Sequence, residues 1–157
     1  MVKLAEIENA ILDLVKANLP YLNDNALTAS TRDFDEDGSI VAAPPAVLAV
    51  FTGSAISPAS VRGLASNYAP RWIMLAGASN LRGSMEEKQG DPAGGEKGVY
   101  DILDDLRALL GGRKLEFESG GQGVVYLRGE ELAQFSPEGT WIGLTIEVQT
   151  DFENADV

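Results

Sequence analysis

The sequence has no cysteine and no histidine among its 157 residues. Without cysteine there are no disulfides, no thiolate metal sites and no cysteine nucleophiles. Without histidine there is no Ser-His-Asp triad, no imidazole metal site, and none of the commonest general base near neutral pH. Carboxylate and lysine chemistry stays open, but these absences disfavour an enzyme. We therefore expect no catalytic residues, no metal ligands and no cofactor.

Basic residues are also scarce, because 12 Lys and Arg stand against 24 Asp and Glu, which makes the formal net charge −12. Such a surface repels nucleic acid and anionic lipid. No window approaches the ~18 apolar residues that a membrane helix needs. The N-terminal apolar segment contains glutamates, which is not typical of a secretory signal. We therefore expect one domain, 1–157, that is made in a cytoplasm and binds no membrane.

The segment "DFDEDGS" at 33–39 begins like a calcium-binding EF-hand loop, with alternating Asp33, Asp35 and Asp37 before a glycine. The twelfth position should be a bidentate glutamate, but it is Pro44. Neither flank has a helical apolar stripe. The segment is therefore predicted to be an acidic, solvated turn between two extended stretches. A monomeric acidic binding module with a weak cation site at 33–37 stays open as the alternative.

Two segments, 3–18 and 99–110, have the periodicity of amphipathic helices. Pro20 ends the first pattern, and Gly111 follows the second as a C-cap residue. The aspartates of the second helix are predicted to form a solvated face. The expected core residues are Leu4, Ile7, Ile11, Leu14 and Val15 in the first helix, and Val99, Ile102, Leu103, Leu106, Leu109 and Leu110 in the second.

Short apolar runs predict buried strands at 46–52 and 71–79, with a turn or short helix at "SPASVRGLAS" between them. Four more strands follow the second helix: "KLEFES", "GVVYLRG", "ELAQFS" and "GTWIGLTIEVQTDF". The stretches "GG", "RGE" and "SPEG" supply the turns. The alternation of polar and apolar residues along the last strand predicts a meander with one solvent-exposed face. The fold class is therefore α+β: a mixed or antiparallel sheet with a closing β-meander, packed against an N-terminal helix and a central helix.

Residues 80–98 are rich in glycine and charge, which predicts a long, exposed, flexible loop. Such a loop either makes contacts or is a tolerated insertion. The phosphate-binding pattern G-x-x-x-x-G-K-[ST] is absent. The final "DFENADV" is acidic and predicted to fray. A carboxylate-based hydrolase needs two or more acids that converge in a pocket, and the sequence shows no such arrangement.

The order of these elements, with "GVYDILDDLRALLGGRKL" in the middle and "GTWIGLTIEVQT" at the end, resembles the tail-terminator (tail-completion) family of Mu-like phages and prophages. The resemblance covers most of the chain, and "DFDEDGS" is not part of it. It implies a structural, non-enzymatic subunit of a hexameric ring that caps the tail tube and stops its polymerisation. The implied partners are the tail tube protein, the sheath in contractile tails, and the head-completion or connector proteins.

The resemblance also implies a place in the virion tail, after assembly in the host bacterial cytoplasm. DNA would pass through the ring without specific binding, which agrees with the acidic composition. Within such a ring, the 80–98 loop is the expected contact segment, through Arg82, Glu86, Glu87 and Lys88. Trp72 and Trp141 are candidates for aromatic anchors at a subunit interface, with ordinary core packing as the alternative.

Overall fold

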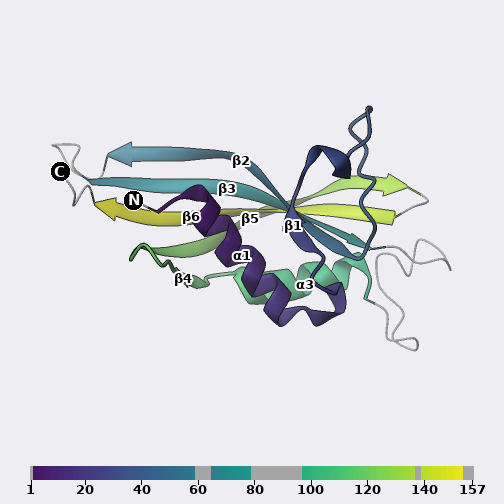
Figure 1. Ribbon diagram of the computed structural model, residues 1–157, viewed down its shortest axis with the longest axis horizontal. Coiled ribbons are helices and arrows are strands. Elements are labelled where there is room, and N and C mark those ends of the chain that lie inside the picture. Colours follow the sequence, from purple (N-terminus) through teal and green to yellow (C-terminus); the bar gives the residue numbers. More distant parts are fainter. Residues whose placement is uncertain (1, 59–64, 79–96, 137–138, 154–157) are drawn as a thin grey trace.

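The computed structural model describes residues 2–58, 65–78, 97–136 and 139–153. Within these residues, two α-helices and two 3-10 turns accompany six strands (Figure 1). The helical elements are α1 (Leu4–Asn18), η1 (Pro20–Leu22), η2 (Thr31–Asp33) and α3 (Val99–Leu110). The strands are β1 (Ala26–Thr28), β2 (Ala46–Pro58), β3 (Ala65–Ala78), β4 (Lys114–Glu116), β5 (Gln122–Ser136) and β6 (Gly139–Glu153).

The six strands form one mixed sheet with the order β1-β2-β3-β6-β5-β4. Only β1 and β2 are parallel, and all other neighbours are antiparallel. The last three strands are consecutive neighbours, which is the predicted closing meander. Helices α1 and α3 contact each other and lie over one face of the sheet (Figure 1). The predicted α+β class is therefore confirmed.

The main core lies between this sheet face and the two helices. Ile7, Ile11 and Val15 of α1 are fully buried there, as the helical periodicity predicts. On β6, the even-numbered residues 142–148 face the helices, and the odd-numbered residues face away. The remaining central members come from the other elements: Trp72, Met74 and Ala76 of β3, Ile102, Leu106 and Leu110 of α3, and Val125 of β5.

The second sheet face is partly covered by the irregular segment 29–45. Ile40 packs there against Leu48, Leu75 and Trp141 in a smaller apolar cluster. The Gln134 side chain ties this segment to β5, because its oxygen accepts a bond from the Ile40 N–H (2.6 Å) and its amide donates to the Ile40 carbonyl (3.0 Å). The sheet thus has a layer on both faces at this end, whereas Arg71 and Arg128, farther along the second face, are about half exposed.

The aspartates of α3 differ from the predicted solvated face. Asp104 is exposed, but Asp101 accepts a hydrogen bond from the Gly98 N–H (3.0 Å) at the start of the helix. Asp105 is half-buried and accepts one from the Tyr21 hydroxyl (2.6 Å). Burial, and then this bond, raise the pKa of Tyr21. The acids therefore cap α3 and join it to η1, which helical periodicity does not reveal.

Several predicted boundaries are wrong. The "RGE" turn does not exist, because β5 continues through it with bulges between Leu127 and Gly129 and between Leu132 and Gln134. A bulge inserts one residue without ending the ladder, so turn-forming residues fit inside a strand. Both strands around "SPASVRGLAS" are longer than predicted, and residues 59–64 lie outside the described part. So do residue 79 of the predicted strand, 80–96 of the predicted loop and 154–157 of the tail, although β6 extends to Glu153.

Candidate interaction site

The two tryptophans predicted to be interface anchors are buried within the chain itself. Trp72 is 0% exposed and Trp141 is 2% exposed, and they lie on opposite faces of the sheet. Their role at an interface stays a prediction, but neither ring forms part of the surface of the single chain. The other predicted contact residues, Arg82, Glu86, Glu87 and Lys88, lie outside the described part of the chain.

The acidic segment at 33–39 is a compact turn. Phe34 and Ile40 form an isolated antiparallel bridge, and Gly38 has the positive φ (80°) that a sharp turn needs. The Asp35 carboxylate accepts hydrogen bonds from the N–H groups of Asp37 (3.0 Å) and Ser39 (2.8 Å). The predicted acidic turn is therefore confirmed, but the 3-10 turn η2 (Thr31–Asp33) directly precedes it where an extended stretch was predicted.

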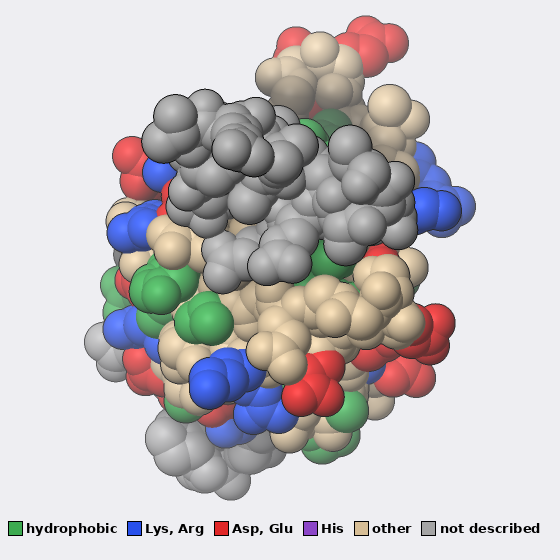
Figure 2. Space-filling view, turned by 90° about the vertical axis from the view of Figure 1, so that its left-hand side faces the viewer, with side chains coloured by type: hydrophobic (Ala, Val, Ile, Leu, Met, Phe, Trp, Pro, Cys, Tyr) green, Lys and Arg blue, Asp and Glu red, His purple; other side chains and the backbone are tan. Residues whose placement is uncertain are grey.

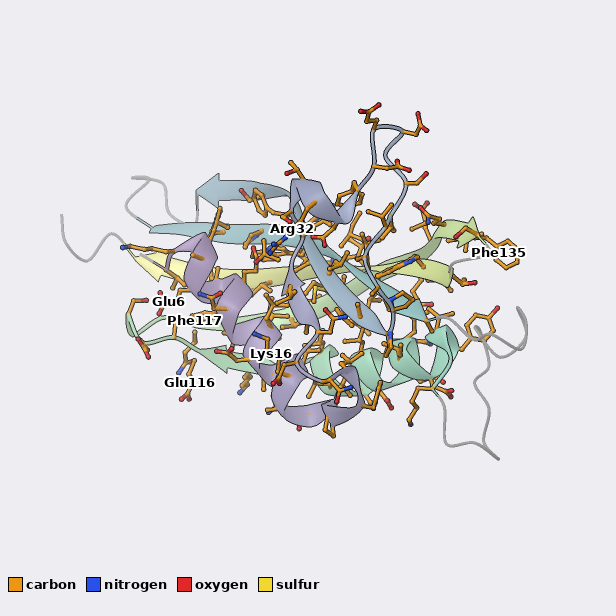
Figure 3. The ribbon with its side chains drawn as sticks, turned by 45° about the vertical axis from the view of Figure 1, so that its right-hand side comes forward. Glu6, Lys16, Arg32, Glu116, Phe117 and Phe135 are labelled. Carbon is orange, nitrogen blue, oxygen red and sulfur yellow. The ribbon has the colours of Figure 1, made fainter. Side chains whose placement is uncertain are left out.

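The structure also defines which acids of this turn are available to a partner. The Asp33 carboxylate accepts a bond from the Ser30 N–H (2.7 Å), so Asp33 and Asp35 are both used by the local backbone. The side chains of Glu36 and Asp37 are exposed, and neither carboxylate bonds to a described residue. Among the described residues, no three acids are placed to hold a metal ion. Figure 3 shows carboxylates projecting into solvent from the tip of this segment.

A polar cluster around Glu147 on the second sheet face was not anticipated from sequence. At its centre, the Glu147 carboxylate is only 4% exposed. Arg71 Nε lies 2.8 Å from Glu147 Oε1, and Arg128 Nη2 lies 2.5 Å from Oε2. Gln149 also donates to Oε2 (2.9 Å). The two arginine side chains are 51% and 42% exposed, so one buried acid holds two guanidinium groups at the surface.

The sheet register brings these residues together from three strands. Arg71 of β3 and Tyr126 of β5 are both paired with Glu147 of β6, so the three side chains share one row and one face. Arg128 is the extra residue of the first β5 bulge, and its guanidinium lies 5.5 Å from the Tyr126 ring centre. The only sequence signal was a glutamate at a polar position of an alternating strand. Its partners are distant in sequence, so that signal alone could not identify the cluster.

The neighbouring side chains keep the Glu147 carboxylate ionised. Burial alone would raise the pKa of Glu147, but hydrogen bonds from Gln149, Arg128 and Arg71 outweigh it and lower the pKa to about 2. A charged, buried carboxylate with several donors is a rigid element of the surface.

This lowered pKa predicts an acid-dependent contribution to stability. A glutamate whose pKa is lower in the folded than in the unfolded state contributes its full stabilisation of the folded state above its unfolded pKa. This contribution is lost as the pH falls from about 4.5 towards about 2. We expect Glu147→Gln to lower the free energy of unfolding by about 1–3 kcal/mol at pH 7, and by much less at pH 3. Denaturant unfolding at both pH values measures this.

Glu131→Gln is the matched control, because Glu131 is exposed and belongs to the neighbouring strand. It should change stability little at either pH. An equal loss for Glu147→Gln at pH 7 and pH 3 would contradict the assigned ionisation.

Both sides of the sheet have long stretches of open strand edge. β1 pairs only with Val47–Ala49 of β2, and β4 pairs only with Gln122–Val124 of β5. Among the described residues, no strand pairs with the rest of either outer edge. Exposed apolar side chains lie along these stretches: Phe51 on β2, and Leu132 (62% exposed) and Phe135 (54%) on β5. Figure 3 shows Phe135 at one end of the molecule, pointing outward. Open edges of this kind are available for pairing with another chain.

One face of the molecule is mixed in charge. Figure 2 shows acidic and basic side chains on the same side of the molecule, despite the net charge of −12. Within the described residues, neither α1 nor α3 has the length and hydrophobicity of a membrane-spanning helix.

Comparison with known proteins gives a family and solved structures of similar fold. The model of the family described as "Bacteriophage Mu, Gp37" matches residues 3–136. The solved structure titled "Virion of native gene transfer agent (GTA) particle" contains a similar chain, with a TM-score of 0.60 and 10% sequence identity. The match covers 94% of this chain and 96% of that chain. At this identity the likeness concerns the fold alone. No curated protein sequence matches.

Proposed function

Because the chain belongs to the bacteriophage Mu Gp37 family, we propose that it is a structural tail-terminator subunit. In this role it forms a ring on the last ring of the tail tube, stops polymerisation and offers the head-joining surface. Family membership over residues 3–136 is the observation that carries the proposal. The fold shared with a chain of a virion structure supports it.

The open sheet edges support assembly into a ring. One edge lies on the β2 side and the other on the β5 side, so they are different surfaces at opposite ends of the strand order. A contact between two different surfaces is head-to-tail, and it generates a closed ring when the rotation per subunit closes. A six-fold ring is the proposed outcome. Backbone hydrogen bonds between edges, with Phe51 and Leu132 nearby, would supply part of the contact.

The charge and the absent residue types also fit this role. A ring through which DNA passes should not bind phosphate, and a chain of net charge −12 repels it. The lack of histidine and cysteine fits a subunit that acts by surface complementarity rather than chemistry. The proposed partners are the tail tube, the sheath in contractile tails, and the head-completion or connector proteins. The proposed location is the virion tail, after assembly in the host bacterial cytoplasm.

The contact with the tube is assigned in this proposal to residues 80–98, which include Arg82, Glu86, Glu87 and Lys88. The length and the Gly-rich, charged composition of this segment support the assignment, since segments of this kind often order on binding.

The test is capping of tail tubes. Tube protein of the same phage is polymerised with and without this protein, and tube lengths and ends are measured by electron microscopy. We expect shorter tubes with a six-fold ring at one end, and a variant lacking residues 84–95 should fold normally but cap poorly. Tubes of unchanged length with bare ends would refute the terminator role. Normal capping by the deletion variant would refute only the assigned contact segment.

A further inference from the structure

Two surface features remain unexplained by the packing of the single chain. The first is the pair Arg71 and Arg128, which projects from the second sheet face. The second is the acidic turn, in which the exposed carboxylates of Glu36 and Asp37 bond to no described residue. Their charges are opposite, which suggests that one binds the other.

The arginine pair has the properties of a carboxylate-binding site. Glu147 uses Nε of Arg71 and Nη2 of Arg128, and the other N–H groups of both guanidiniums bond to no described residue. Two guanidiniums around one carboxylate leave a local net charge of about +1, whereas the whole chain is strongly acidic. Guanidinium groups bind carboxylates through paired N–H donors. Because Glu147 already fixes both side chains, little conformational entropy is lost on binding.

The acidic turn cannot reach this site within one chain. The turn lies at the end of the sheet where a hollow of about 420 Å³ is lined by Asp35, Ile40 and Trp141. On β6, Trp141 and Glu147 are separated by about 20 Å of strand. The turn also stands out from the body of the chain, beyond the sheet (Figure 1). A projecting group of this kind reaches a neighbouring molecule more readily than its own distant arginines.

We propose that Glu36 and Asp37 of one copy bind the Arg71–Arg128 pair of the next copy in the ring. This inference rests on the proposed ring. Charge complementarity identifies the occupant, since the chain itself carries a projecting acidic group that matches its own basic site. The two surfaces are different, so each copy uses both once, and the contact can repeat around a closed ring. It would also explain why Glu147 is buried: the acid orients the arginines for a partner.

The absence of cysteine makes disulfide cross-linking a direct test. The chain would carry Glu36→Cys and Tyr126→Cys, because Tyr126 adjoins the arginine pair and is exposed. Oxidation of the assembled protein should produce a ladder of linked subunits that ends at the closed ring. Asp13→Cys with Tyr126→Cys is the matched control, because Asp13 lies on the exposed side of α1. That control should remain monomeric on a denaturing gel.

Charge reversal tests the same contact without a cross-link. Glu36→Lys with Asp37→Lys should raise the concentration needed for assembly by about tenfold or more, because two attractions become repulsions. Asp13→Lys with Glu118→Lys makes the same change in net charge at other exposed positions and should have little effect. Light scattering over a concentration series measures both, and circular dichroism verifies folding.

The outcomes separate this inference from the proposed function. If rings form and cap tubes, but the reversed variant assembles normally and no ladder appears, the contact is refuted and the ring stands. If the protein stays monomeric alone and on tail tubes, both the ring and the contact are refuted.

Discussion

Replacing Trp72 with alanine is expected to lower the free energy of unfolding by about 3–5 kcal/mol. The indole is fully buried among the residues of the main core, and Phe51 packs edge-on against it at 5.6 Å between ring centres. Its N–H donates to Glu8 Oε2 (3.2 Å), and the Thr28 hydroxyl donates to the same carboxylate. The substitution removes a large apolar volume and leaves a cavity that the surrounding sheet and helices cannot readily fill.

Denaturant unfolding of the purified variant measures this loss. Leu132→Ala is the control, because that side chain is 62% exposed and should change stability by less than about 0.5 kcal/mol. The experiment also separates the two roles predicted for Trp72. Removal of a core side chain lowers the stability of the isolated chain. Removal of an interface anchor would leave that stability unchanged and weaken only the assembly.

Replacing Gly77 with alanine is expected to cost about 3 kcal/mol, at the upper end of the range for overpacking. Gly77 and Trp141 are direct partners across β3 and β6, and a Cβ on Gly77 would overlap the Trp141 ring system. The overlapping atoms belong to the rigid indole rather than to the end of a flexible side chain. Trp141 is also enclosed by the small cluster that includes Ile40, Leu48 and Leu75, which limits its movement.

A double-mutant cycle isolates the cause of this cost. In a Trp141→Leu background, Gly77→Ala should cost less than about 1 kcal/mol, because the colliding ring is gone. Gly129→Ala is the control, since a Cβ there has no heavy atom within 4 Å, and it should be neutral or slightly stabilising. An equal cost of Gly77→Ala in both backgrounds would show that backbone strain, rather than the indole, is responsible.

The two tryptophans show that residue type alone does not distinguish a core residue from an interface residue. Aromatic side chains are enriched at cores and at interfaces alike, so sequence alone leaves both roles open for Trp72 and Trp141. Whether each tryptophan belongs to the core or to an interface depends on which part of the chain covers its ring. For Trp141 this is the segment around Ile40, about a hundred residues earlier in the chain, which no local pattern connects to β6.

The predicted helices and the meander were confirmed because their signals are local. The apolar spacing of 99–110 and the alternation along 141–148 are set by the geometry of a helix and of a strand. Membership of the Mu Gp37 family confirms the expected relation to Mu-like phages. The "RGE" turn was wrong because glycine and charge are compatible with both a turn and a bulge.

The sequence by itself determined the α+β class, the two helices, the alternating last strand, the acidic turn and the exclusion of histidine and cysteine chemistry. These follow from composition and from short-range periodicity, which the backbone geometry imposes wherever the chain folds. Only the tertiary structure decided that Glu147 is buried between Arg71 and Arg128, that Trp141 covers Gly77, and that no described strand pairs with long stretches of the two outer edges. Each of these depends on sheet register and on contacts between residues far apart in sequence.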